Sequence, residues 1–176
     1  MSTPETFNVL FLCTGNSARS ILAEGILRKV GAGRFNAFSA GSFPKGEVNR
    51  LAIEALREAG YPVDGMRSKS WDEFAVPGAP QMDFVFTVCD QAAGEACPVW
   101  PGQPVTGHWG IEDPSHETRG EMWQRAAFRQ ALAYMENRIK AFIALPIQSL
   151  NRTSLTTQVR EIGHLEGASS PRPDVA

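Results

Sequence analysis

Cysteine is scarce in this chain: only Cys13, Cys89 and Cys97 occur among its 176 residues. An odd number argues against a framework made purely of structural disulfides. In a reducing compartment such thiols serve more often in catalysis or metal binding. Each of the three cysteines is therefore a candidate functional group.

Long apolar runs and an excess of one charge are missing as well. No segment approaches the roughly 20 apolar residues that cross a bilayer, and the opening MSTPET lacks the basic and apolar regions of a signal peptide. Seventeen Lys and Arg against nineteen Asp and Glu leave a formal net charge of -2, which disfavours nucleic acid and anionic membranes as partners. We expect a cytoplasmic protein that binds neither a membrane nor nucleic acid.

What the sequence does contain is an alternation of strand-like and helix-like segments, in a chain long enough for one core. Apolar runs predict strands at residues 6 to 12, 35 to 41, 82 to 89 and 103 to 109, with a short strand or a loop after residue 60. Helical spacing of apolar residues predicts helices at 17 to 30, 47 to 60 and about 117 to 145. This alternation indicates a doubly wound α/β fold.

The composition changes after Pro146. SLTTQVREIG predicts one more short helix, and EGASSPRPDVA has the Pro, Ser and Gly content of a disordered tail. We expect a domain over residues 1–145 and a C-terminal extension over residues 146–176, made of a short helix and a disordered tail.

The stretch FLCTGNSARS places a loop between a predicted strand and a predicted helix. Backbone N–H groups of such a loop converge on one point, and the helix start adds positive potential, so an oxyanion fits there. Gly15 permits a tight turn, and the planar guanidinium of Arg19 grips two oxygens. The predicted oxyanion-binding residues are Thr14, Gly15, Asn16, Ser17, Ala18, Arg19 and Ser20.

Cys13 lies at the base of this loop, and the positive surroundings predict a thiol pKa below that of a free cysteine. We expect Ser20 to hydrogen-bond the Cys13 sulfur and Asn16 to hold the loop's shape. The plainer alternative is a buried thiol at a strand end with Arg19 exposed on a helix. A second cysteine, Cys89, ends another predicted strand, and carboxyl ends of parallel strands meet at one edge.

FLCTGNSARS, AEG at 23 to 25, SAG at 39 to 41 and EDP at 112 to 114 occur in an order that resembles the low-molecular-weight protein tyrosine phosphatase superfamily. The resemblance covers about residues 6 to 145. CTGNSARS, VCD, ACPVWPG and HWGIEDP are similar to its arsenate reductase branch. The implied fold is a three-layer α/β fold, with a four-stranded parallel sheet and helices on both faces.

The resemblance also implies a reaction. Cys13 forms a thiol–arsenate adduct, Cys89 attacks its sulfur, arsenite leaves, and Cys97 moves the disulfide outward. Asp113 becomes the general acid that protonates the departing oxygen; the plainer alternative is an aspartate that caps a turn or helix ahead of Pro114. No bound cofactor or metal is implied, and the electrons come from an external reductant, thioredoxin or glutathione with glutaredoxin. We expect a monomer.

This sequence departs from the family pattern at three places. The loop after Asp113 reads DPSHET, without the tyrosine that follows DP in phosphotyrosine-specific members. Position 18 is alanine, where many members carry a further cysteine. Some reductases bind potassium near equivalents of Asn16, Glu24 and Ser39, with an acidic residue near position 69. Here Lys69 stands at that position, and we expect it to pair with Glu24 in place of an ion.

We expect an arsenate reductase, and two alternatives stay open. A phosphatase acting on phosphate monoesters would use Cys13, Arg19 and Asp113 but not the other two thiols. A catalytically silent oxyanion-binding protein would have an unreactive Cys13. In either case Cys89 is an inert buried thiol and Cys97 a surface one.

Overall fold

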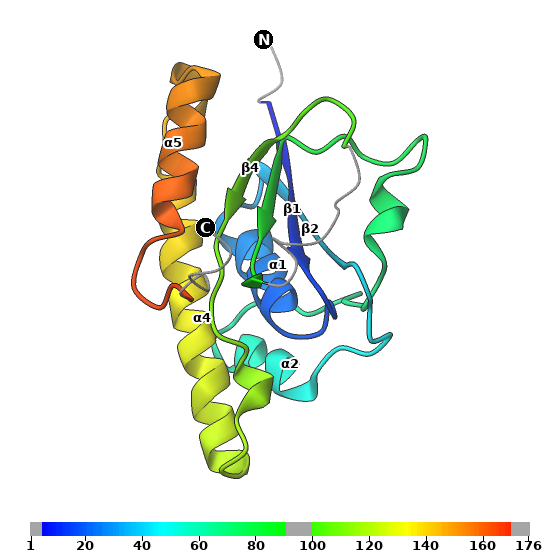
Figure 1. The fold of residues 1–176 in the computed structure, drawn as a ribbon, viewed down its shortest axis with the longest axis vertical. Helices are drawn as coiled ribbons and strands as arrows, with labels where there is room; N and C mark the ends of the chain where they lie inside the picture. Colours follow the sequence, from blue (N-terminus) through cyan, green and yellow to red (C-terminus); the bar gives the residue numbers. More distant parts are fainter. Residues whose placement is uncertain (1–4, 91–99, 170–176) are drawn as a thin grey trace.

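A computed structural model describes residues 5–90 and 100–169. Its centre is a parallel sheet of four strands in the order β2-β1-β3-β4 (Figure 1). The strands are β1 (Phe7–Cys13), β2 (Phe35–Gly41), β3 (Phe84–Thr87) and β4 (Val105–His108). This sheet confirms the expected fold. Within the described residues, no helix is long and apolar enough to cross a membrane.

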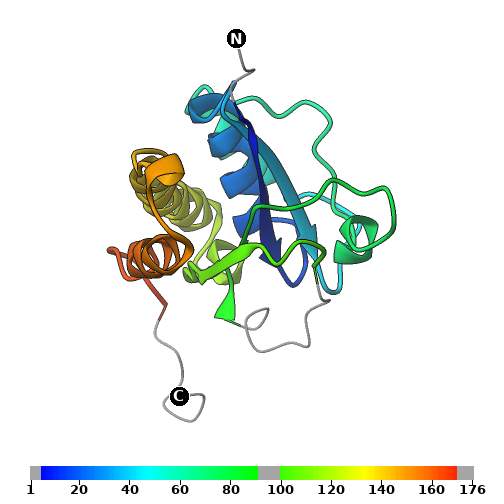
Figure 2. The ribbon, with the colours of Figure 1, turned by 90° about the horizontal axis from the view of Figure 1, so that it is seen from above.

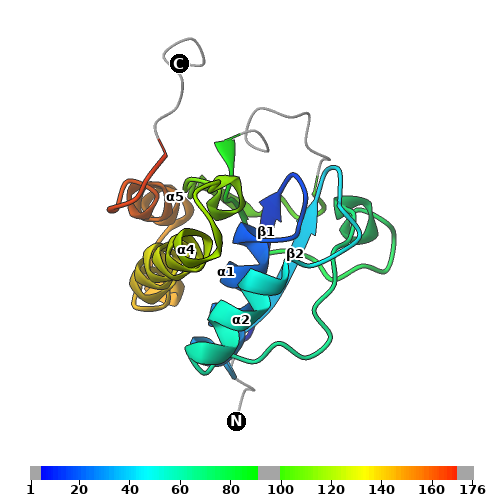
Figure 3. The ribbon, with the colours of Figure 1, turned by 90° about the horizontal axis from the view of Figure 1, so that it is seen from below.

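The α-helices gather on one face of the sheet, as Figures 2 and 3 show. They are α1 (Arg19–Val30), α2 (Arg50–Glu58), α4 (Glu121–Ile143) and α5 (Arg152–Ile162). The other face, where the expected fold also has helices, carries the short 3₁₀ helix η1 (Trp71–Phe74) and extended chain instead of an α-helix. Further short turns are η2 (Pro114–His116) and η3 (Ile147–Ser149).

Strand β1 is central because both of its faces are apolar. Val9 and Phe11 belong to the core beneath the α-helices, whereas Leu10 and Leu12 belong to the smaller core beneath η1. All four side chains have zero exposure. Burial on both faces is what a parallel sheet requires, and it explains why this strand reads as a continuous apolar run.

Strand β2 has the expected bounds and β1 is shifted by one residue, whereas the other expected helices and strands of residues 1–145 are shorter in the structure. Helix α1 begins at Arg19 rather than at residue 17, and Asn49 caps α2 by accepting from the Leu51 N–H at 2.8 Å. Strand β3 stops at Thr87, so Cys89 lies two residues beyond it. Of the two expectations after residue 60, the loop is observed, with a single bridge between Gly41 and Ser70.

Helix α5, which belongs to the C-terminal extension, packs into the same hydrophobic core as the other α-helices. Leu155, Val159 and Ile162 are buried in it, and the Trp109 indole donates to the Val159 carbonyl at 2.8 Å. The tail expected to be disordered begins at Glu166, yet residues 166–169 have defined contacts. Residues 170–176 lie outside the described ranges.

Candidate active site

The loop of residues 14–18 joins the end of β1 to the start of α1, as the motif predicts. Cys13 is the last residue of the strand and has 5% exposure. Helix α1 begins without a side-chain cap, because Ala18 stands at that position. The first N–H groups of the helix therefore depend on another acceptor, and an oxyanion is one.

Asn16 holds the loop's shape, as expected. Its backbone is left-handed at φ 45°, and its fully buried amide donates to Ser20 Oγ at 2.9 Å and to Ser39 Oγ at 3.0 Å. The Lys69 N–H donates to Asn16 Oδ1 at 2.9 Å. Ser20 thus supports the loop through Asn16, and the described contacts contain no bond from Ser20 to the Cys13 sulfur.

Residues after β2 press against the outside of the loop. The Phe43 N–H donates to the Thr14 carbonyl at 2.9 Å, and the Lys45 N–H donates to the Gly15 carbonyl at 3.0 Å. A Cβ on Gly41 would lie 2.4 Å from the Thr14 oxygen. Only glycine permits this approach. The carbonyls of Thr14 and Gly15 are therefore engaged on the side of the loop that faces these residues.

Arg19 and Asp113 come together across the mouth of the loop. Arg19 Nη2 lies 3.3 Å from Asp113 Oδ2, and Nη1 donates to the Ile111 carbonyl at 2.9 Å. The side chains are 14% and 16% exposed. Arg19 Nε is buried and has no hydrogen-bond partner among the described residues. The guanidinium therefore keeps one donor unsatisfied, close to where an oxyanion would bind.

The pKa of Asp113 lies below its usual value. Burial raises that pKa, but Arg19, two hydrogen bonds from Ser115 and the nearby His116 together outweigh burial. Ser115 donates from its N–H at 2.9 Å and from its hydroxyl at 2.7 Å, and His116 Nε2 lies 3.4 Å from the carboxylate. Because Arg19 holds this pKa down, the Asp113 carboxyl would become better able to hold a proton if Arg19 turned to another anion.

Cys89 reaches the same site. It is 2% exposed, its sulfur lies 3.6 Å from Thr14 Oγ1, and it is hydrogen-bonded to Cys13. That hydrogen bond and burial raise the pKa of the Cys13 thiol, while Arg19 lowers it. The expected low pKa of Cys13 is therefore wrong for this arrangement, because a second thiol stands where the motif suggested only positive charge. Cys97 lies outside the described residues.

Comparison with known proteins agrees with this geometry. The family model for low molecular weight phosphotyrosine protein phosphatase matches residues 8–156. The chain belongs to this family. An arsenate reductase from Bacillus licheniformis is 37% identical over 134 residues, which span 76% of this chain and 93% of that protein.

Solved structures of the phosphatase family resemble the chain as well. An arsenate reductase in the phosphate-binding state has a TM-score of 0.66 at 28% identity and covers 79% of this chain and 98% of its own. A low molecular weight protein tyrosine phosphatase from T. tengcongensis has a TM-score of 0.62 at 25% identity, over 78% and 98%. Both kinds of family member therefore share this fold.

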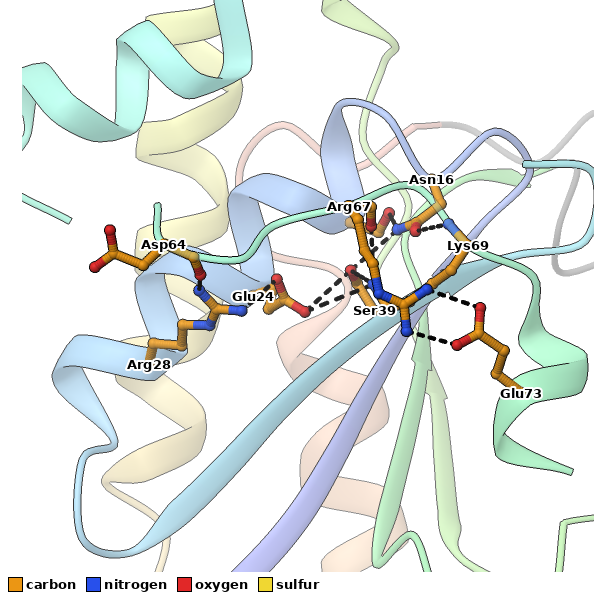
Figure 4. A network of polar contacts seen from close by, with 9 residues as sticks. Asn16, Glu24, Arg28, Ser39, Asp64, Arg67, Lys69 and Glu73 are labelled. Carbon is orange, nitrogen blue, oxygen red and sulfur yellow. Dashed lines mark hydrogen bonds and ion pairs between the residues drawn. The ribbon is translucent and has the colours of Figure 1, made fainter. Parts of the chain in front are cut away.

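Behind the phosphatase-family loop lies a buried polar network, drawn in Figure 4. Lys69 Nζ lies 3.9 Å from Glu24 Oε1 and 3.4 Å from Ser39 Oγ. The Glu24 carboxylate also pairs with Arg28 at 3.2 Å. Burial raises the pKa of Glu24 and lowers that of Lys69. The expected pairing of Lys69 with Glu24 is confirmed.

Sequence reasoning missed several supports of the family site. The Ile111 carbonyl, Ser115 and the Ser68 hydroxyl, which donates to the Gly15 carbonyl at 3.0 Å, carried no recognisable signal. Gly41 did carry a signal, because it ends the SAG motif. No group of three metal-ligating side chains occurs within the described part of the chain.

Proposed function

We propose that this protein reduces arsenate to arsenite, with electrons from a pair of its own thiols. The contact between Cys89 and Cys13 carries the proposal. Ester hydrolysis needs one nucleophile, whereas reduction of arsenic needs two electrons and hence two sulfurs. The arsenate reductases at 37% and 34% identity support the same substrate.

Arsenate binds in the loop of residues 14–18. Its oxygens accept from the uncapped N–H groups at the start of α1 and from Arg19, whose Nε has no other acceptor among the described residues. Arg19 then shares its charge with arsenate as well as with Asp113. The pKa of Asp113 rises toward its usual value, and the carboxyl becomes able to hold a proton.

The first step joins sulfur to arsenic. The Cys13 thiolate attacks arsenic, an arsenic–oxygen bond breaks, and that oxygen leaves as water after Asp113 supplies a proton. The contact with Cys89 raises the pKa of Cys13. The thiolate therefore forms only when an oxygen of the bound oxyanion accepts the Cys13 proton or when the contact with Cys89 changes.

The second step transfers the electrons. Cys89 loses its proton and attacks the Cys13 sulfur. The sulfur–arsenic bond breaks, and its electron pair stays on arsenic, which goes from pentavalent to trivalent and leaves as arsenite. Two thiols have become one disulfide. Cys97 then attacks the Cys89 sulfur, the Cys13–Cys89 bond breaks, and Cys13 leaves as a thiol, so that the disulfide now joins Cys89 and Cys97. An external thiol reductant, thioredoxin or a glutathione and glutaredoxin system, supplies the two electrons that return both of these cysteines to thiols.

Hydrolysis of phosphate monoesters is the second candidate. The pair of Arg19 and Asp113 beside Cys13 favours it, because these three groups suffice for a phosphocysteine intermediate and its hydrolysis. In that function Cys89 is dispensable.

The deciding experiment measures arsenite production from arsenate by the wild type, Cys13→Ser and Cys89→Ser, with each donor system in turn. Hydrolysis of a generic aryl phosphate is followed in parallel. We expect no turnover of either kind with Cys13→Ser, and loss of arsenite production alone with Cys89→Ser. Ester hydrolysis without arsenite from the wild type would make the protein a phosphatase. If the wild type produces neither arsenite nor the hydrolysed ester, the protein is an oxyanion-binding protein without catalytic activity.

A further inference from the structure

The last described residues, 165–169, are fixed to α4, and we call them the C-terminal clasp. The guanidinium of Arg138, with zero exposure, donates from Nη1 to the Glu166 carbonyl at 3.0 Å and from Nη2 to the Leu165 carbonyl at 3.1 Å. Gly167, at φ +91°, then turns the chain back toward the sheet. A buried guanidinium donating to two successive carbonyls leaves the clasp little freedom.

The clasp first contacts the segment that leads to Asp113. Ala168 forms an antiparallel bridge with Ile111, and the Ser169 N–H donates to the Gly110 carbonyl at 3.0 Å. The carbonyl of Ile111 is the one that accepts from Arg19. One side of the clasp therefore supports the acid segment.

Its other side contacts the residue that follows Cys89. The Ser169 hydroxyl donates to Asp90 Oδ1 at 2.9 Å, and His108 Nε2 lies 2.7 Å from the same oxygen. A carboxylate only accepts, so His108 is the donor in that contact. His108 Nδ1 in turn lies 2.7 Å from Thr87 Oγ1, at the end of β3. Asp90 is thus held from the sheet and from the clasp together.

Gly110 makes this meeting possible. A Cβ at position 110 would lie 2.6 Å from each of three polar atoms: Asp90 Oδ1, His108 Nε2 and Ser169 Oγ. The three groups converge directly over the glycine, closer than any side chain would permit. A substitution at Gly110 should therefore separate them without touching Cys13 or Cys89.

We propose that Asp90 is a positioning residue for the thiol relay, and that the C-terminal clasp holds it so that Cys89 stays beside Cys13. The proposal rests on the proposed function and adds to it a role for residues 165–169. These residues lie beyond position 156, where the family match ends. The clasp therefore lies outside the part of the chain that matches the family model.

The physical reason is that Asp90 directly follows Cys89 in the chain. Cys89 lies between two fixed residues. On one side the Val88 N–H donates to the Leu12 carbonyl at 2.8 Å, and on the other the Asp90 carboxylate is bonded to His108 and to Ser169. Attack of one sulfur on another requires both to be held in line, and the rate falls steeply when one partner is free to move. Losing the bonds at Asp90 should slow closure of the disulfide while leaving the first reaction of Cys13 unchanged.

The test uses hydrogen peroxide rather than arsenate, in a Cys97→Ser background. Peroxide gives its oxygen to the Cys13 sulfur, forming a sulfenic acid and one water; Cys89 then attacks that sulfur, forming the disulfide and a second water. Dimedone in the solution traps any sulfenic acid that Cys89 fails to capture. Mass spectrometry gives the ratio of disulfide to dimedone adduct, which reports closure, and the sum of both, which reports the first step.

We expect Asp90→Ala and Gly110→Ala to lower this ratio about tenfold, and Ser169→Ala severalfold, with the sum unchanged. Asp90→Asn should stay near the wild-type ratio, because its amide oxygen still accepts from both donors. Asp64→Ala, which removes an exposed carboxylate elsewhere, is the matched control. With Cys97 restored, Asp90→Ala should lower kcat for arsenite production and leave KM for arsenate within about twofold.

An unchanged ratio in Asp90→Ala overturns the proposal. So does an equal loss in Asp90→Asn, or a fall in the first step, because either would indicate general loosening of the site. Failure of the proposed function has a different signature: a wild type that closes the disulfide under peroxide but makes no arsenite from arsenate.

Discussion

The Nη2 atom of Arg19 lies 3.3 Å from Oδ2 of Asp113, so the residue expected to grip the oxyanion is paired with the residue expected to protonate it. Each side chain is largely buried, which strengthens the pairing. In the proposed reaction, an arriving oxyanion would give Arg19 a second negative partner and weaken its hold on Asp113. Substrate binding and protonation of Asp113 would then be linked through one guanidinium.

Arg19→Lys should lower kcat/KM for the substrate oxyanion about a hundredfold or more, because an ammonium lacks the planar fork that contacts two oxygens. The Ile111 carbonyl would also lose its donor. Steady-state kinetics check this, with Arg160→Lys on the exposed side of α5 as the control. Equal activity of the two variants would show that Arg19 supplies charge alone.

Asp113→Asn should lower kcat about a hundredfold or more while leaving oxyanion affinity similar, because the amide has no proton to donate. Kinetics over a range of pH should lose the limb that reports the acid. An activated substrate with a good leaving group should be affected much less, since its departing oxygen needs no proton. If both substrates slow equally, Asp113 acts on binding or structure instead.

Asp113 should also contribute to the pH dependence of stability. Its pKa is lower in the folded protein than in the unfolded chain, so its stabilising contribution is present above the unfolded value, about 3.9, and is lost as pH falls through the folded value. Urea unfolding from neutral pH into this acidic window should show Asp113→Asn losing less free energy of unfolding than the wild type. Parallel curves would contradict the pairing with Arg19.

Lys69→Met should lower the free energy of unfolding by about 2 kcal/mol, because it leaves Glu24 buried with Arg28 as its remaining charged partner. Burial raises the pKa of Glu24, and loss of Lys69 raises it further. The deficit should therefore be largest at neutral pH and shrink on acidification as Glu24 takes up a proton. The double variant Lys69→Met with Glu24→Gln should recover part of the loss in urea unfolding.

Gly41→Ala should disrupt the oxyanion loop. The new Cβ would lie 2.4 Å from the Thr14 oxygen and 3.0 Å from the Asn16 nitrogen, both backbone atoms of the loop. We expect a destabilisation of about 1–3 kcal/mol together with a large loss of turnover. Gly65→Ala, strained at φ +70° but with open space around its Cβ, should cost stability and keep activity. Retained turnover in Gly41→Ala would show that the loop can shift.

The sequence by itself determined the order of strands and helices along the chain and the place of the loop of residues 14–18, because both depend on local patterns. β1 is apolar on both faces, and the residues Cys13 to Arg19 carry their loop chemistry within seven positions. The pairing of Lys69 with Glu24 was also foreseen, from a resemblance and not from spacing. Boundaries were less accurate, since a cap such as Asn49 makes α2 begin at Arg50, three residues after the expected start.

Only the tertiary structure decided how distant segments share the site. The pKa of Cys13 depends on Cys89, which is 76 positions away, and on burial, which no local motif expresses. The clasp that brings Ser169 to Asp90 depends on Arg138 and on a glycine at 110. Electrostatic balance and close packing are set by the distances between segments, and those distances exist only after the chain has folded.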